Sequence, residues 1–232
     1  MMPRHRRTSQ SGVSLPEVMI VVFLLGIVIA TFYDSFQSAQ KTSGRIDAQM
    51  EHLAEAQGLL RSVTKDIRTA TSIQPSSSAF IVAGPREVQF YAYLEQGSST
   101  STTATLPVPE RIRLWVDTTD PAKPVLREES KKADTPITTP PTYTGSQPTT
   151  LRLLGTYIQN TGPTQPLFRY LDYQGHEIVP TGADLSATDK LRVRSILIEL
   201  RVKRSTSGTV KPTTVRAKIR LPNVIFSVAP GT

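Results

Sequence analysis

Hydrophobic residues follow two successive patterns in the first third of the chain, and the first is a nearly continuous apolar run. It covers residues 13–33 and is broken close to its start by Pro16 and Glu17. About 20 apolar residues are enough for a helix to cross a membrane. Because proline is tolerated in the first turn of a helix but not in its interior, the helix should begin close to Val13.

Apolar residues then recur every three or four positions, which is the period of one face of an α-helix. This predicted seam consists of Phe32, Phe36, Ala39, Ile46, Met50, Leu53, Leu60 and Ile67, with Ser43, Gln57 and Thr64 as interruptions. We expect one long helix whose amphipathic half, residues 34–72, packs under a sheet. It should end near Thr69 to Ser72, before Pro75 and a run of serines.

After Pro75 the helical period disappears, and short β-rich runs alternate with segments rich in Pro, Ser and Thr. The expected strands are Phe80–Ala83, Glu87–Leu94, Arg111–Asp117, Val125–Glu128, Leu151–Ile158, Leu167–Asp172, Arg194–Lys203 and Val215–Leu221. The last two alternate between apolar and polar residues and should form a hairpin. A long helix followed by antiparallel strands predicts an α+β fold, with residues 73–232 as a β-rich globular domain.

Two segments of that domain read as long loops, residues 96–109 and residues 118–147, the second interrupted only by the strand at Val125. Loops of this length in a compact domain are usually functional or disordered. Their Ser, Thr and Pro content favours disorder here.

Composition narrows the chemistry that the chain can perform. It has 232 residues, a net charge of +8 and no cysteine, so disulfides, zinc–thiolate sites and cysteine nucleophiles are excluded. Arg4, Arg6 and Arg7 place three of the positive charges in residues 1–12. The remaining excess is mild and is not typical of a nucleic-acid-binding domain.

No arrangement of side chains predicts catalysis, a metal site or a cofactor. His5, His52 and His176 lack the spacing of metal ligands, and no phosphate-binding loop or nucleophile motif is present. Glu128 and Glu129 are adjacent in an expected strand, so their side chains point to opposite faces and do not make a catalytic pair. The sequence therefore predicts a protein that is not an enzyme.

Glu17 separates three interpretations of the N-terminal segment. A secretory signal would need a small-residue cleavage site after its apolar core, but Ala30 is followed by Thr31, Phe32 and Tyr33. A simple anchor helix would need a reason to keep a carboxylate at its edge. An acidic residue at the centre of a membrane helix costs roughly 2.5–3.5 kcal/mol, and although the cost falls towards the end, a polar partner is still favoured.

The basic leader, Gly12, the sequence Val13-Ser14-Leu15-Pro16-Glu17 and the apolar run together resemble the processing site of type IV prepilins and pseudopilins. The resemblance implies that a prepilin peptidase removes residues 1–12 by cutting after Gly12, and that Val13 becomes the N-methylated terminus. It also implies that Glu17 lies near the methylated amine of a neighbouring subunit. Val13 replaces the commoner phenylalanine, and Pro16 is occasional in the family.

Three later stretches resemble J-type pseudopilins and W-type minor pilins. They are the helix ending Asp66-Ile67-Arg68-Thr69-Ala70, the turn at Asp172–Gly175 and the closing hairpin of residues 191–202 and 215–223. Asp172–Gly175 also has the composition of an ordinary turn, without a metal role.

The resemblance implies a type IV pilin-like fold and a minor pilin or pseudopilin that primes or caps a type IV pilus, a type II secretion pseudopilus or a competence pseudopilus. The implied partners are the prepilin peptidase, other pilin subunits, an inner-membrane assembly platform and membrane lipid. The implied location is the cytoplasmic membrane, crossed once by residues 13–33 with the N-terminus inside, and then an extracytoplasmic fibre.

Two other functions remain open. Residues 190–220 contain ten basic residues and one acid, Glu199, and the five that could share the exposed face of the hairpin are Arg201, Lys203, Arg216, Lys218 and Arg220. Such a stripe could follow the phosphates of DNA, which some competence minor pilins bind. A solvated strand face that discourages edge pairing is the favoured explanation. The other function is a single-pass anchored exported domain that never polymerises.

Overall fold

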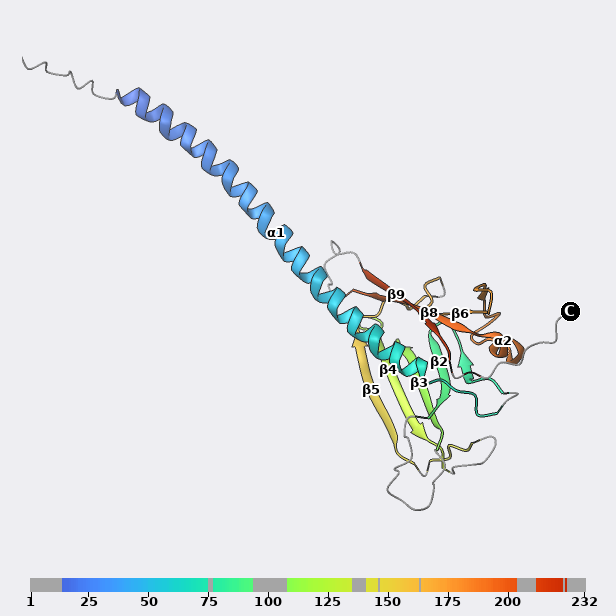
Figure 1. The fold of residues 1–232 in the computed structure, drawn as a ribbon. Coiled ribbons are helices and arrows are strands. Elements are labelled where there is room, and N and C mark those ends of the chain that lie inside the picture. The colour runs from blue at the N-terminus through green and yellow to red at the C-terminus, as the bar shows by residue number, and fades with distance from the viewer. Residues whose placement is uncertain are drawn as a thin grey trace, which may run out of the picture. The chain divides into compact units, whose positions relative to one another are not determined.

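The structure is a computed structural model, and it describes residues 14–74, 77–93, 108–134, 141–145, 147–162, 164–203, 212–222 and 224. In chain order its elements are α1 (Leu15–Arg68), β1 (Phe80–Ala83), β2 (Glu87–Ala92), β3 (Glu110–Asp117), β4 (Val125–Lys132), β5 (Thr149–Thr156), β6 (Phe168–Leu171), β7 (Glu177–Ile178), α2 (Ala187–Arg192), β8 (Ser195–Val202) and β9 (Thr213–Arg220) (Figure 1). The chain divides into two compact units, Met1–Ala48 and Gln49–Thr232, and α1 contributes to both.

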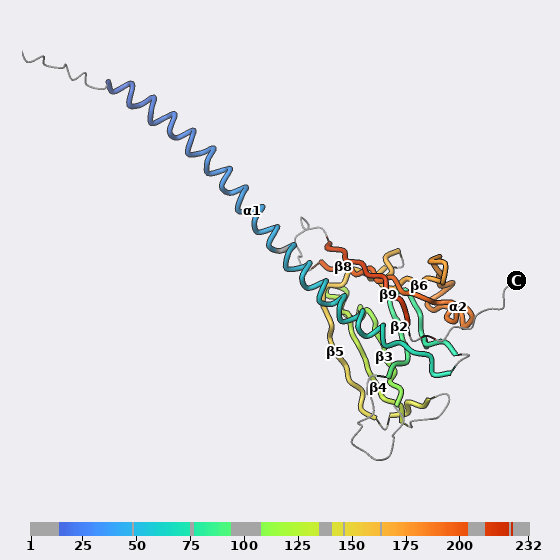
Figure 2. Tube along the Cα trace, viewed as in Figure 1, coloured from blue at the N-terminus to red at the C-terminus, as the bar shows by residue number. Residues whose placement is uncertain are grey.

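The predicted long helix is confirmed as α1, which has 54 residues and runs without a break (Figure 2). Its end at Arg68 comes one residue earlier than the expected range. Strand pairing explains the difference, because Ala70 already forms a β-bridge with Ala92 and the Thr71 N–H donates to the Tyr91 carbonyl at 2.8 Å. Val13, the expected start, lies outside the described residues.

The domain contains two antiparallel sheets, although the sequence had suggested one. The first has five strands in the order β1-β2-β3-β4-β5, and the second has four in the order β7-β6-β8-β9. The first sheet ends after β5, where Tyr157 has a φ of 60° and the chain leaves that sheet. Ile158 then forms a bridge with Val202 at the end of β8, so this short connection joins the two sheets. The expected α+β fold, with a long helix and antiparallel strands, is confirmed.

Asn160 strengthens the connection between the sheets. Its side chain is fully buried, and its amide nitrogen donates to the Glu199 carbonyl at 2.8 Å while Oδ1 accepts from the Arg201 N–H at 2.9 Å. A buried amide with partners for both its donor and its acceptor atoms fixes the position of the neighbouring backbone. Asn160 therefore holds the segment after β5 against β8.

The last turns of α1 and both sheets share one hydrophobic core, and the face that α1 buries differs from the predicted seam. The buried residues of this part of the helix are His52, Ala56, Leu59, Val63 and Ile67. The predicted seam included Met50, Leu53 and Gln57, which are exposed, and shares only Ile67 with the buried face. The buried face of the helix is displaced by about one residue from the predicted seam, because Val63 and Leu59 give a more apolar face than Thr64 and Gln57.

All eight predicted strands are present, with small shifts of their ends, and β4 shows the largest difference. It continues to Lys132, so part of the predicted loop 118–147 is strand. The charged residues after Glu128 pair with both neighbouring strands, and Arg111 of β3 contacts Glu129 at 3.3 Å. The segments 94–107 and 135–140, which contain most of the other predicted loop residues, lie outside the described residues.

Two short elements were not predicted. β7 has only two residues, too few to give a pattern. Helix α2 begins after Ser186, whose hydroxyl accepts from the Asp189 N–H at 3.1 Å and donates to the Asp189 carboxylate at 2.7 Å. This reciprocal cap, with Lys190 and Arg192 in the last turn, is a sequence signal that could have identified the helix.

Candidate functional sites

The first half of α1 presents its apolar side chains to the surroundings. Phe32 is 75% exposed and Leu15 is 78% exposed, and every large apolar side chain from Leu15 to Phe36 is exposed. By length and composition, α1 is the one described helix that could cross a membrane. In water a surface of this kind would be costly, since each fully buried large apolar side chain gains roughly 1.5–3 kcal/mol. This half of the helix is therefore a surface for lipid or for another protein.

The helix begins with residues that suit a first turn. Pro16 is its second residue, where no intrahelical N–H bond is needed. The N–H groups of Glu17 and Val18 donate to the Ser14 carbonyl at 3.0 and 3.2 Å. Glu17 is exposed in the first turn, where the helix dipole favours a negative charge. Gly12 and Val13, the predicted cleavage and methylation residues, lie outside the described residues.

A shallow apolar groove of about 350 Å³ runs along the same part of α1. It is lined by Val28, Ile29, Phe32, Tyr33 and Phe36. These residues lie in two rows with a spacing of four, and such rows form the ridges and grooves by which helices pack together. The groove could accept the side chains of a second helix.

The outward face of the second sheet carries the predicted basic residues, and the structure brings them together. Arg216, Lys218 and Arg220 alternate along β9 and are exposed, while Arg201, near the end of β8, and Lys203, directly after that strand, are half-buried. The strands pair antiparallel, with Arg216 opposite Glu199 and Lys218 opposite Leu197. The five members of this predicted face are therefore not equivalent in exposure.

Glu199 neutralises part of this basic face. Its carboxylate accepts from Arg201 Nε at 3.0 Å and from Arg216 Nε at 3.0 Å. Burial raises the pKa of Glu199, but the hydrogen bonds and charges of the two arginines outweigh it and leave the pKa below its usual value. Among the described residues, no carboxylate pairs with Lys218 or Arg220. Within the part of the chain that the structure describes, the unpaired charge of the face therefore lies on Lys218 and Arg220 of β9 and on Lys203 directly after β8.

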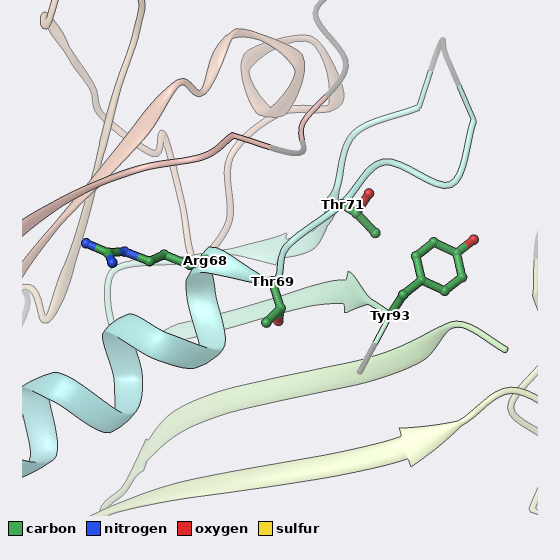
Figure 3. Close-up of a pocket in the computed structure, with 4 residues that line it drawn as sticks. All are labelled: Arg68, Thr69, Thr71 and Tyr93. Atoms are coloured by element: carbon green, nitrogen blue, oxygen red, sulfur yellow. The ribbon is translucent and has the colours of Figure 1, made fainter. Parts of the chain in front are cut away.

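A cavity of about 440 Å³ lies beyond the end of α1, lined by Arg68, Thr69, Thr71 and Tyr93. Figure 3 shows that the Arg68 side chain points away from Tyr93, so the charged group and the aromatic ring do not converge. Among the residues that the structure describes, the lining of this cavity therefore offers no polar constellation that would orient a ligand.

The carboxylate of the predicted turn at Asp172–Gly175 is occupied by hydrogen bonds within that turn. Asp172 accepts from the N–H groups of Gln174 and His176 at 2.9 and 2.8 Å, which forms the predicted turn before Gly175 at φ 87°. Burial raises the pKa of Asp172, but these backbone donors outweigh it and lower the pKa overall. Within the described part of the chain, no group of three or more His, Cys, Asp or Glu side chains could hold a metal ion.

Sequence reasoning missed one buried acid. Glu128 and Glu129 do point to opposite faces, as predicted, and Glu129 pairs with Arg111. Glu128 is instead only 6% exposed, and its Oε1 accepts from Arg152 Nη1 at 3.3 Å. Nothing in the local sequence could have revealed this burial, because it depends on which face of the sheet the rest of the chain covers.

Comparison with known proteins identifies the N-terminal segment. The family described as the prokaryotic N-terminal methylation motif matches residues 7–33. No curated protein and no solved structure gives a significant match to the chain. The match covers the region that contains Gly12, Val13 and Glu17, and the rest of the chain supplies the long helix and antiparallel sheets. The chain thus carries the prepilin-type signal of the type IV pilin and pseudopilin superfamily, on a type IV pilin-like α+β architecture.

Proposed function

We propose that this protein is a minor pilin or pseudopilin that primes or caps the assembly of a type IV pilus, a type II secretion pseudopilus or a competence pseudopilus. The observation that carries the proposal is the exposed apolar half of α1, most of which lies within the matched residues 7–33. A structural subunit of this kind needs a helix surface that its own domain leaves uncovered. The protein is not an enzyme and needs no cofactor.

The proposed maturation follows from the signal. A prepilin peptidase cuts after Gly12, removes residues 1–12 and leaves Val13 to be methylated. Residues 13–33 hold the subunit in the cytoplasmic membrane with the N-terminus inside, residues 34–72 contain the amphipathic half of α1 and the short segment after it, and residues 73–232 form the extracytoplasmic domain. The inner-membrane assembly platform then transfers the subunit from membrane lipid to the fibre.

Glu17 is proposed as the assembly residue. In a low-dielectric setting, a carboxylate is stabilised strongly by a nearby positive charge and is costly when alone. The methylated amine of Val13 on a neighbouring subunit is the proposed partner. The apolar groove from Val28 to Phe36 is the proposed contact for the helix of that neighbour.

The test replaces Glu17 and a matched acid on the same helix. Glu17→Val should be processed to a chain that begins at Val13, and should enter the membrane, but should be absent from purified fibres. Asp47→Val removes another exposed carboxylate of α1 and should be incorporated like the natural subunit. Mass spectrometry of the N-terminus reports processing, and quantitative immunoblotting of fibres reports assembly. Normal incorporation of Glu17→Val would contradict the role of Glu17.

Processing also tests the alternative of an anchored exported domain that does not polymerise. An N-terminus that stays intact in cells containing the peptidase would favour that alternative. A chain that is cut and methylated at Val13 but never found in fibres would favour it as well.

DNA binding is a second candidate function, supported by the two unpaired cations of β9. Binding to a single-stranded nucleic acid weakens with salt, and the slope of log K against log salt concentration is about −0.7 for each phosphate contact. Each contact that is removed therefore reduces the size of this slope by about 0.7. Replacing Lys218 and Arg220 by alanine should therefore weaken DNA binding and reduce the salt slope by about 1.4. Arg61→Ala with Arg68→Ala removes the same charge from exposed positions on α1 and is the control. Equal effects of the two double variants, or no binding at low salt, would contradict a DNA site on this face.

A further inference from the structure

An exposed tyrosine lies beside the basic face of the second sheet. Tyr173 belongs to the turn between β6 and β7 and is 78% exposed, whereas Tyr93 of the same domain is 40% exposed. Gln174 Nε2 donates to the Tyr173 hydroxyl at 2.9 Å, so the contact is made at the edge of the ring. Within the described part of the chain, no other ring or cation stacks on Tyr173. The faces of the ring are therefore open to a ligand.

The turn that carries Tyr173 is held by several internal hydrogen bonds. The Asp172 carboxylate accepts from the backbone N–H groups of Gln174 and His176, and the Gly175 N–H donates to the Asp172 carbonyl at 3.2 Å. The Asp172 N–H in turn donates to the His176 carbonyl at 3.0 Å. A ring on a fixed turn loses less conformational freedom when a ligand stacks on it than a ring on a flexible segment does.

The cations of β9 reach this turn, although β8 lies between β6 and β9 in the sheet. A Cβ built on Gly175 would lie 3.8 Å from Lys218 Nζ, so the ammonium group is beside the turn. Arg220 is on the same face of β9, about 6.8 Å further along the strand. We call Tyr173, Lys218 and Arg220 the turn–β9 surface.

The register of the second sheet brings Arg220 to the same end of the surface. Ser195 of β8 pairs with Arg220 on one side and with Leu171, the last residue of β6, on the other. The turn with Tyr173 begins directly after Leu171. One ligand can therefore contact the ring and both cations.

The carboxylates around the turn–β9 surface are already bound to other groups. Glu177 accepts from Arg169 Nε at 2.7 Å, and Glu199 binds the two arginines described above. Asp172 is occupied by the N–H groups of its own turn. Among the ion pairs of the described residues, none includes Lys218 or Arg220. The surface therefore presents positive charge and an open aromatic ring side by side.

We propose that the turn–β9 surface binds single-stranded nucleic acid, with a base stacked on Tyr173 and phosphates on Lys218 and Arg220. The inference rests on the DNA binding proposed above as the second candidate function, and it specifies the form of nucleic acid. An unpaired base can place its flat face on a protein ring, whereas the bases of a duplex are stacked on one another. Because every base has such a face, the surface should show little sequence preference.

Binding of a fluorescent thymidine oligonucleotide to the full chain in detergent micelles tests the stacking. Tyr173→Ala should weaken this binding by about 5- to 150-fold. The same variant should bind an abasic strand of equal length as the natural chain does, because that strand keeps the phosphates and has no base to stack. Tyr173→Phe keeps the ring and should bind normally. Tyr93→Ala removes an exposed tyrosine that follows β2 of the first sheet, and is the matched control.

Salt dependence separates the ring from the charges. Tyr173→Ala should leave the slope of log K against log salt concentration unchanged, whereas Lys218→Ala should reduce its size by about 0.7. A duplex that binds as tightly as the single strand, with sensitivity to Lys218→Ala but not to Tyr173→Ala, would overturn this inference and leave DNA binding on the basic face in place. Absence of binding to either form at low salt would contradict both. Tighter binding of a sulfated polysaccharide than of the oligonucleotide would also overturn the inference.

Discussion

The two halves of α1 contain the same kinds of apolar residue, but only one half is covered by its own chain. Phe32 in the first half is 75% exposed, whereas Ile67 in the second half is fully buried. The second half packs on two sheets, and the first half lies in a separate compact unit with no described partner. Periodicity identifies an apolar face, but the identity of what covers it depends on the rest of the chain or on another molecule.

The largest expected effect comes from truncating one apolar residue in each half. Ile67→Ala should lower the free energy of unfolding of the domain by about 2–5 kcal/mol, since it leaves a cavity in the shared core. Phe32→Ala should change it by less than about 0.5 kcal/mol, because that side chain is 75% exposed and belongs to a different compact unit. Denaturant unfolding of the full chain in micelles measures both.

The comparison also predicts where the Phe32 variant does have an effect. Phe32→Ala removes part of the apolar groove and should reduce the amount of protein found in fibres. Ile67→Ala should reduce assembly only in proportion to the folded protein that remains. Equal losses of domain stability in the two variants would remove the distinction between the two halves.

Much of this architecture could be predicted from the sequence, and the errors have physical causes. The helix, all eight longer strands and the exposed alternation of Arg216, Lys218 and Arg220 follow from local period and β-propensity. The buried face of α1 was displaced by one residue, because several faces of an apolar-rich helix can form a seam. Only the fold decides that Val63 faces the core.

The candidate sites divide in the same way between local and long-range information. The prepilin signal is contained in one short stretch, so Gly12, Val13 and Glu17 could be named from sequence. The pairing of Glu199 with Arg201 is also local, since residues two apart in a strand share a face. The burial of the Glu128 side chain is not local information, because no pattern in its segment indicates which face of β4 the rest of the chain covers.

A smaller effect is expected where α1 approaches the sheet most closely. Gly155 lies in β5 directly beneath Leu59, and a Cβ at this position would come within 2.4 Å of Leu59 Cδ1. Gly155→Ala should therefore destabilise the domain by about 1–3 kcal/mol through overpacking. In a Leu59→Ala background, the same change should cost much less, because the clashing atoms are gone. A double-mutant cycle measures this coupling, and additive losses would contradict the close contact.

The smallest expected effect uses two glycines of α1 to ask whether its halves unfold together. Gly58 and Gly44 both lie in the helix with nothing within 4 Å of an added Cβ, so alanine fits at either position. Gly58→Ala should raise the free energy of unfolding of the domain by about 0.5–1 kcal/mol, because alanine loses less conformational entropy in a helix. Gly44→Ala makes the same chemical change in the unit that ends at Ala48, and should leave domain unfolding unchanged while increasing helix content before the transition. Circular dichroism during denaturation reports both quantities. If Gly44→Ala stabilised the domain as much as Gly58→Ala does, the exposed half would have to unfold cooperatively with the buried half.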